Sequence, residues 1–171
     1  MVDRDKLYHL RLREKEEGGP SLDIVTREEW GAQPCTALRP RETPPRDVII
    51  PMDHVTFTHT STEPCYDREE CAQVLRRIQN DQLATVELHD MTFNFMIGGD
   101  GAVYEGRGWY KEPHRPLLYE YLENRGIEVA YIGEYEDVPP PPEMLRAAFD
   151  FLLYGMKIKL IKPTHKCIHL A

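Results

Sequence analysis

A histidine–threonine pair and two cysteines lie close together in the stretch MDHVTFTHTSTEPCYDREEC, residues 52–71. A strand-like run ends on His59-Thr60, and Cys65 and Cys71 follow it. Imidazole nitrogen and thiolate sulfur are common protein ligands of zinc, so these residues could belong to a metal site. The two cysteines could instead close a short disulfide loop, as in proteins of oxidising compartments, or remain independent thiols. Their spacing alone leaves these alternatives open.

The composition limits the classes of protein that need to be considered. The chain has 171 residues, 41% of them hydrophobic, which is typical of one globular domain with a substantial core. Its net charge is -8 and its Lys and Arg residues form no cluster, so nucleic acids and anionic membrane surfaces are disfavoured as partners. No apolar run approaches the about 18 residues of a membrane-spanning helix.

The first twenty residues differ in character from the remainder. Residues 1–20 are charged throughout and lack the apolar segment of a secretory leader. We expect them to form a solvated tail or linker that ends at Gly18-Gly19-Pro20, followed by one domain over residues 21–171. A processed secreted protein and a cytoplasmic protein are both compatible with this segment.

Short runs of β-branched and aromatic residues predict several strands. Gly98-Gly99-Asp100-Gly101 separates two of them, which predicts a β-hairpin. A phosphate-binding loop is disfavoured here because such a loop should open a helix. The strand candidates are residues 48–50, 54–59, 93–97, 102–105 and 127–131.

Two longer segments have the periodicity of amphipathic helices. The first covers residues 71–83, and the second covers residues 143–154. Thr26 and Glu29 have the spacing of a capping box, which predicts a short turn that buries Trp30. Because strands and helices are interleaved, we expect a mixed sheet with packed helices. The apolar stripe of the second helix is Leu145, Ala148, Phe149, Leu152, Leu153 and Met156.

Several phrases, taken in order, resemble the peptidoglycan recognition proteins, and the resemblance runs from about residue 22 to the C-terminus. The segment 104–109, YEGRGW, is the most specific of them. This family shares the fold of the zinc-dependent N-acetylmuramoyl-L-alanine amidases. The phrases are IVTREEWGA at residues 24–32, His59-Thr60 with Cys65 and Cys71, FNFMIGGDG at residues 93–101, VYEGRGW at residues 103–109, YIG at residues 131–133 and VPP at residues 138–140.

The resemblance implies an α/β fold with a mixed central β-sheet flanked by helices and a groove on one face. It also implies a disulfide between Cys65 and Cys71. The final helix of the family would lie beyond Ala171, so the fold is expected without its C-terminal helix. A secreted protein or the extracellular part of a membrane receptor is the implied location, and the absence of a recognisable leader keeps a cytoplasmic form as the alternative.

Amidase members of the family hold zinc with two histidines and one cysteine, and a tyrosine lies beside the metal. Thr58 stands where the first histidine ligand is expected, and Phe93 stands where the tyrosine is expected. Leu170 takes the place of the second histidine, and the cysteine would lie beyond Ala171. His59 follows Thr58 but should point to the other face of its strand. We therefore expect no catalytic residues, no zinc and no other cofactor, and hence no amidase activity.

The histidines near the C-terminus allow two further interpretations. A displaced zinc site could use His59, His165, Cys167 and His169, of which Cys167 and His169 form a local pair. A frayed, solvated C-terminus is the interpretation that we favour. Zinc-dependent amidase activity thus remains the weakest of the functional hypotheses.

Binding of muramyl peptides does not require zinc. An arginine can bind a stem-peptide carboxylate through two hydrogen bonds, which suits Arg107. Core packing of Trp109 and backbone hydrogen bonding by Arg107 are equally weighted alternatives. Glu87-Leu88 and the segment from Tyr110 to Gly126 depart from the family pattern. The residues expected to bind ligand are His59, Thr60, Phe93, Asn94, Arg107, Gly108 and Trp109.

We expect a non-catalytic pattern-recognition or regulatory protein of innate immunity that binds muramyl peptides. The alternative is a signalling regulator that acts through protein contacts without peptidoglycan binding. The expected partners are bacterial peptidoglycan fragments, another peptidoglycan recognition protein, or a second copy of the chain.

Overall fold

A six-stranded sheet forms the centre of the part of the chain that the computed structural model describes, which is residues 22–34, 44–84, 88–114 and 124–170. The proposed tail, residues 1–20, lies outside the described residues. The strand order is β1-β4-β3-β5-β2-β6. The elements are β1 (Ile24–Val25), α2 (Arg27–Trp30), β2 (Met52–His59), α3 (Arg68–Ala84), β3 (Phe95–Ile97), β4 (Val103–Glu105), β5 (Gly126–Tyr131), α5 (Pro142–Lys157) and β6 (Ile161–His169).

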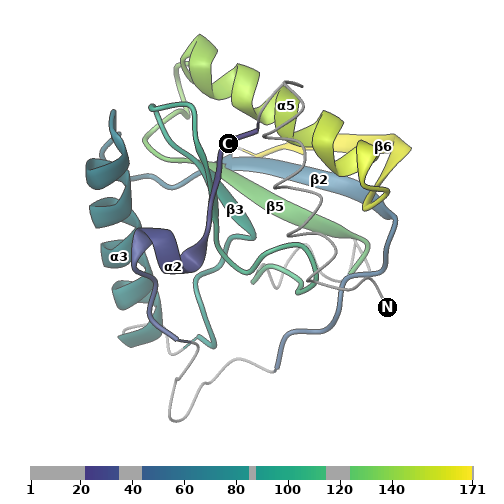
Figure 1. The fold of residues 1–171 in the computed structure, drawn as a ribbon, viewed down its shortest axis with the longest axis horizontal. Coiled ribbons are helices and arrows are strands. Elements are labelled where there is room, and N and C mark those ends of the chain that lie inside the picture. The colour runs from purple at the N-terminus through teal and green to yellow at the C-terminus, as the bar shows by residue number, and fades with distance from the viewer. Residues whose placement is uncertain (1–21, 35–43, 85–87, 115–123, 171) are drawn as a thin grey trace.

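The sheet is mixed, as the sequence predicts. β3 and β4 form the antiparallel hairpin around residues 98–101, whereas β2 pairs in parallel with both β5 and β6. In Figure 1, α3 lies on one side of the sheet and α5 lies on the other. The α/β class with helices flanking a mixed sheet is thereby confirmed.

Two hydrophobic clusters hold the helices to the sheet. On the α5 side, Val55 and Phe57 of β2 pack with Met144 and Phe151 of α5. On the α3 side, Leu75 of α3 packs in the second cluster, which also contains Ala130 of β5. Since side chains alternate along a strand, one strand contributes to both clusters.

The capping box at the start of α2 is present. The Thr26 side chain accepts a hydrogen bond from the Glu29 backbone, and the Glu29 carboxylate accepts one from the Thr26 N–H at 2.6 Å. This turn directs Trp30 inward, where it is fully buried and its indole N–H donates to the Glu105 carbonyl at 2.8 Å. α2 is thus fixed to the end of β4.

The C-terminal residues are ordered as a strand, contrary to the frayed end that we expected. β6 pairs with β2 from Ile161 to His169 and forms an edge of the sheet. Pro163 can be accommodated there because an edge strand has backbone groups that need no sheet partner. Residues 48–50, in contrast, form no strand: the Val48 and Ile49 N–H groups donate to separate loop carbonyls, those of Tyr110 and Asn124.

The orientation of α5 also differs from the prediction. Three of the six residues of the expected stripe are solvent-exposed: Leu145 is 45% exposed, Phe149 60% and Leu153 42%. The other three, Ala148, Leu152 and Met156, belong to the core or pack against it. α5 carries apolar residues on two adjacent sides, and the side that packs on the sheet combines large residues with small ones that permit close approach. The buried residues of α5 are Met144, Ala147, Ala148, Phe151 and Gly155.

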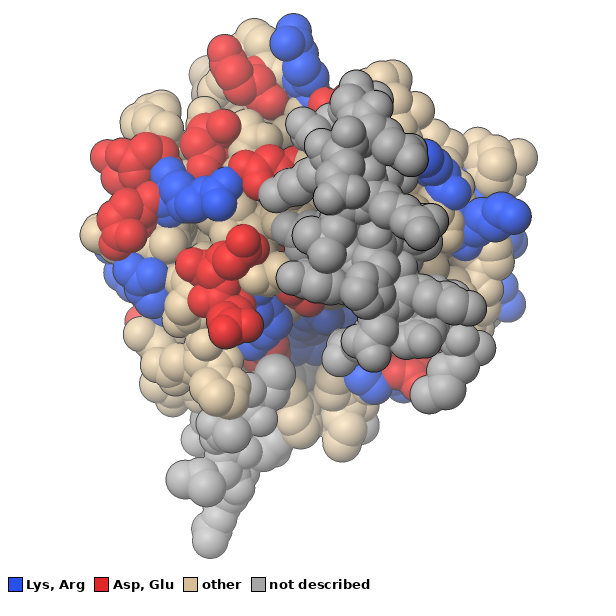
Figure 2. All heavy atoms as spheres, in the orientation of Figure 1, with Lys and Arg blue, Asp and Glu red and all other residues tan. Residues whose placement is uncertain are grey.

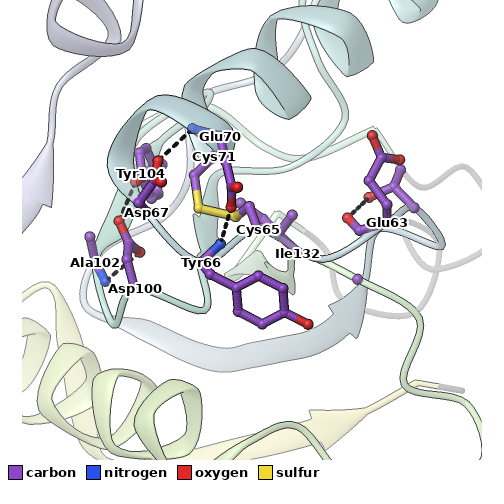
Figure 3. Close-up of a disulfide and its surroundings, with 12 residues drawn as sticks. Glu63, Cys65, Tyr66, Asp67, Glu70, Cys71, Asp100, Ala102, Tyr104 and Ile132 are labelled. Atoms are coloured by element: carbon purple, nitrogen blue, oxygen red, sulfur yellow. Dashed lines mark hydrogen bonds between the residues drawn. A yellow bond between two sulfur atoms is a disulfide. The ribbon is translucent and has the colours of Figure 1, made fainter.

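The disulfide that the resemblance implies is confirmed. Cys65 and Cys71 are bonded and tie the loop after β2 to the first turn of α3 (Figure 3). Asp67 caps this turn by accepting from the Glu70 N–H at 2.9 Å, and Glu70 reaches back to the Tyr66 N–H at 2.9 Å. The start of α3 is therefore fixed by both a covalent bond and reciprocal capping.

Removal of this disulfide should destabilise the protein measurably. For a closed loop of this length the chain-entropy model predicts a loss of about 2–3 kcal/mol in the free energy of unfolding. The double substitution Cys65→Ser and Cys71→Ser can be compared with Cys167→Ser, which changes an exposed free thiol, by urea denaturation. An equal loss in the two proteins would contradict a stabilising role for the disulfide.

On the face drawn in Figure 2, carboxylate groups gather over α2 and α3, interspersed with basic side chains. The first turn of each helix carries two carboxylates, which interact favourably with the helix dipole: Glu28 and Glu29 in α2, and Glu69 and Glu70 in α3.

Within the described residues, no helix has both the length and the hydrophobicity needed to cross a membrane.

Candidate functional site

The two faces of β2 separate the candidate residues. Val55 and Phe57 point into the α5-side cluster, so Thr56 and Thr58 point to the opposite side, which we call the α3 face of the sheet. Thr58 pairs in register with Ala130, which belongs to the α3-side cluster. Thr56 and Thr58 are 2% and 5% exposed. The α3 face therefore carries buried hydroxyl groups in the middle of the sheet.

The three residues that stand at the expected zinc and tyrosine positions lie on this same face. Phe93 belongs to the α3-side cluster. The Leu170 N–H donates to the Phe57 carbonyl at 2.9 Å, and Leu170 follows His169 on β6, so it points to the same side as Thr58. A neutral hydroxyl, a phenyl ring and an alkyl side chain offer none of the nitrogen, thiolate or carboxylate ligands that zinc requires. These residues do not fit a catalytic zinc ion.

The residues of the displaced zinc hypothesis lie apart from this constellation. The His169 ring stacks on Phe57, with ring centroids 5.6 Å apart, and therefore faces α5. His165 Nδ1 lies 2.8 Å from the Lys162 carbonyl oxygen. Cys167 carries an exposed free thiol. In the described ranges, no group of three or more His, Cys, Asp and Glu residues is placed to hold a metal ion.

His59 and Thr60 connect the end of β2 to the turn after β5. His59 Nδ1 lies 3.2 Å from a Glu134 carboxylate oxygen and also 3.2 Å from the Tyr135 backbone nitrogen, which donates to it. The Thr60 hydroxyl accepts from the Gly133 N–H at 3.0 Å. Both side chains thus have partners within the protein, and their expected role in binding ligand stays a prediction.

Asn94 joins three segments of the backbone. Its side-chain amide donates to the carbonyls of Gly108 and Lys111 at 2.9 and 2.5 Å, and its carbonyl accepts from the Glu128 N–H at 2.9 Å. The residue is fully buried. Asn94 therefore fixes the segment after β4 against the start of β3 and the middle of β5.

Arg107 is also engaged with the backbone. Its guanidinium donates to the carbonyls of Met91 at 2.6 Å, Glu112 at 3.2 Å and Asp90 at 3.3 Å. These contacts correspond to the structural alternative weighed for this arginine. Arg27, a residue that the sequence analysis did not single out, is paired with the buried Asp90 carboxylate at 2.7 Å.

Trp109 packs with the aromatic residues of the α5 side. Its ring stacks on Phe151, with centroids 4.7 Å apart and an interplanar angle of 3°, and it also contacts Phe95 at 4.7 Å. Trp109 lines a cavity of about 660 Å³ between the start of α2, the segment after β4 and the end of α5. Arg107 and Gly108 line this cavity too, whereas Thr58, His59 and Phe93 do not.

The structure therefore divides the predicted binding residues among separate places. His59 and Thr60 lie at the end of β2, Phe93 lies on the α3 face, and residues 107–109 border the cavity beside α5. Asn94 links these regions through the backbone.

One buried carboxylate was not predicted from the sequence. Glu128 is 1% exposed and pairs in register with Thr56 on the α3 face. A single acidic residue inside β5, whose six residues are all buried, is the sequence signal that could have found it, since buried carboxylates need specific partners.

Comparison with known proteins supplies the remaining evidence. Residues 48–169 match a family model described as N-acetylmuramoyl-L-alanine amidase. Peptidoglycan-recognition protein 2 of Holotrichia diomphalia is 30% identical over 145 residues, covering 85% of this chain and 72% of that protein. Peptidoglycan-recognition protein SD of Drosophila simulans is 36% identical over 150 residues, covering 86% and 74%.

Solved structures agree with these matches. The ectodomain of the Drosophila transmembrane receptor PGRP-LCa superposes with a TM-score of 0.75 at 31% identity, covering 85% of this chain and 83% of that chain. The structure of peptidoglycan recognition protein-LE in complex with tracheal cytotoxin, a monomeric diaminopimelic acid-type peptidoglycan, gives a TM-score of 0.74 at 27% identity, covering 85% and 81%.

Proposed function

Because the chain belongs to the peptidoglycan recognition protein family, we propose that it is a non-catalytic recognition protein of innate immunity that binds muramyl peptides. The observation that carries this proposal is the set of side chains at the zinc positions. Thr58, Phe93 and Leu170 share one face of the sheet but provide no metal ligand and no tyrosine hydroxyl. Such a face can contact a ligand without hydrolysing it.

We place the ligand on the α3 face, over the ends of β2 and β5. A muramyl peptide carries amide and hydroxyl groups that need partners when they are buried. By the resemblance, Thr58 stands where the amidases hold their metal, and we propose that its hydroxyl, on a residue that is 5% exposed, meets the lactyl–alanine junction. Complex formation by peptidoglycan recognition protein-LE supports this class of ligand.

Asn94 and Arg107 take supporting roles in this proposal. Their side-chain donors are directed at backbone carbonyls, and together they hold residues 106–112 against the sheet. The stem-peptide carboxylate expected to bind Arg107 would therefore have to displace these bonds.

A second candidate function follows from the same observation. With Asn94 and Arg107 bonded within the fold, a regulator that acts through protein contacts and binds no peptidoglycan is the alternative. In either case we propose an extracellular location, supported by the Cys65–Cys71 disulfide, because disulfides persist in oxidising compartments.

Calorimetric titration with muropeptides of the diaminopimelate and lysine types, with zinc content measured on the same sample, tests the proposal. We expect micromolar binding of at least one type, no stoichiometric zinc and no release of stem peptide. Cleavage by a zinc-loaded sample would show that the protein is an amidase. A folded sample that binds neither peptide would exclude the receptor and favour the regulator.

A matched pair of substitutions locates the binding surface. Thr58→Val removes a hydroxyl from the α3 face, and Thr164→Val makes the same change at an exposed position of β6. Loss of one hydrogen bond to the ligand should weaken binding by roughly 3- to 10-fold for Thr58→Val. Equal affinities of the two variants would place the ligand elsewhere.

A further inference from the structure

The outer side of α5 carries an exposed apolar row that the proposed function does not use. Leu145, Phe149 and Leu153 are spaced four residues apart, and all three are exposed. The opposite side of α5 packs on the sheet, so this row points away from the protein, and Figure 1 shows α5 as the outermost layer on its side. We call these three residues the outer row of α5. Contiguous exposed apolar side chains of this kind mark interaction sites.

The row is symmetric about its central residue. If a second α5 helix packs against it in antiparallel orientation, with a two-fold axis at Phe149, then Leu145 of each copy meets Leu153 of the other. Phe149 meets its own equivalent. A two-fold interface requires this property, because the same patch must be complementary to itself.

The charged residues beside the row have the same symmetry. With a rotation of 100° per residue, Glu143, Arg146, Asp150 and Lys157 all lie on one side of the row, about 60–120° from Phe149. A two-fold axis perpendicular to the helices brings this side of one helix against the same side of the other. The charges of the two copies therefore face each other in reverse order.

The antiparallel orientation places each of these charged side chains beside one of opposite charge on the second helix. Arg146 precedes Phe149, and therefore the two-fold axis, by three residues. Asp150 follows Phe149 by one residue, so the axis places Asp150 of the second copy on the same side as Arg146, one residue from the axis. The two are offset by two residues, about 3 Å along the helix. Glu143 and Lys157 of the second copy have the same offset of two residues. Each pair occurs twice, so four ion pairs border the apolar row.

We propose that α5 is a homodimer interface, occupied by the α5 helix of a second copy of this chain. This inference does not rest on the proposed function, because the outer row lies across the sheet from the α3 face. Self-association and muropeptide binding can therefore be tested separately.

The interface is small, and its strength can be bounded. α5 has 16 residues, a length of about 24 Å, and presents less surface than the roughly 800 Å² per partner of a standard interface. We therefore expect a dissociation constant in the micromolar range. Sedimentation velocity from about 5 to about 500 μM brackets this range and reports the mass directly.

Substitution of the central residue gives the first test. Phe149→Asp places two carboxylates at the two-fold axis and should weaken the dimer by roughly 30-fold or more. Tyr66→Asp, at an exposed aromatic residue outside α5, is the matched control and should leave the dissociation constant unchanged. A monomer at every concentration, or equal weakening by both variants, would overturn the proposal.

Charge reversal tests the antiparallel arrangement itself. Arg146→Asp alone and Asp150→Arg alone each set like charges against each other twice, and each should weaken the dimer by roughly 5- to 30-fold. The double variant restores opposite charges across the axis and should recover the dimer. Association that the single changes weaken and the double change does not restore would exclude this two-fold geometry.

Discussion

Replacing Asn94 with alanine should lower the free energy of unfolding by about 3–5 kcal/mol, because buried polar groups without partners cost about 1–3 kcal/mol each. The side chain donates to the carbonyls of Gly108 and Lys111 and accepts from the Glu128 N–H, and the residue is fully buried. Alanine removes the side-chain partner of all three backbone groups. Urea denaturation monitored by tryptophan fluorescence measures the loss.

Asn80→Ala is the matched control for this change. Asn80 lies on the exposed side of α3, where its carbonyl accepts from Gln33 Nε2 at 2.6 Å. Surface substitutions of this kind usually change stability by less than about 0.5 kcal/mol. If Asn94→Ala were as stable as Asn80→Ala but failed to bind muropeptide, Asn94 would be a ligand contact and the structural role assigned to it would be wrong.

The local sequence pattern was sufficient to predict those elements whose signal lies within one short segment. The capping box at Thr26, the β3–β4 hairpin and α3 are each encoded within one short segment. β6 is different: its nine residues include a proline and two lysines and show no alternation. Its strand conformation depends on pairing with β2, which lies about a hundred residues earlier, and no local signal reports such pairing.

The direction of α5 could not be predicted from its sequence for a related reason. Apolar residues occupy two adjacent sides of the helix, so periodicity identifies a helix without selecting the buried side. Packing on the sheet selects the side that carries Met144 and Phe151 together with three small residues, which permit close approach: Ala147, Ala148 and Gly155. Leu145, Phe149 and Leu153 are left exposed, and they are the basis of the proposed dimer.

The residues of the candidate site were predicted from their types. The type of a residue does not determine which group its side chain will bind. An arginine after a strand can bind a carboxylate or hold a loop, and in this fold Arg107 donates to three backbone carbonyls. The common face of Thr58 and Leu170 could not be predicted either, because it depends on the parallel register of β2 and β6, and the sequence favoured a frayed C-terminus in place of β6.

The second large effect is expected at Gly99, in the turn between β3 and β4. A Cβ atom at this position would overlap the backbone carbonyl oxygen of Cys65, which already accepts the Gly99 N–H at 3.0 Å. The Cys65–Cys71 bond ties the loop that carries this carbonyl to the first turn of α3 (Figure 3), so we expect the carbonyl to withdraw only at a cost. We expect Gly99→Ala to lower the free energy of unfolding by about 3 kcal/mol, the upper part of the range for overpacking.

Gly101 offers a control within the same turn. A Cβ atom there would meet no atom within 4 Å, but the residue has φ of +77°. Gly101→Ala should therefore cost only the backbone strain, about 1–2 kcal/mol. If the two alanine variants were equally stable, contact with the disulfide loop could not be the reason for glycine at position 99.

A double-mutant cycle then separates the disulfide from the turn. In protein carrying Cys65→Ser and Cys71→Ser, the loop after β2 is no longer tied to α3 and can move away from the added methyl group. The cost of Gly99→Ala should fall by about 1 kcal/mol or more in this background, whereas the cost of Gly101→Ala should stay the same. An unchanged cost at Gly99 would mean that hydrogen bonding and packing hold the loop without help from the covalent bond. A reduced cost would show that the disulfide and the hairpin turn act as one rigid unit beside the end of β2.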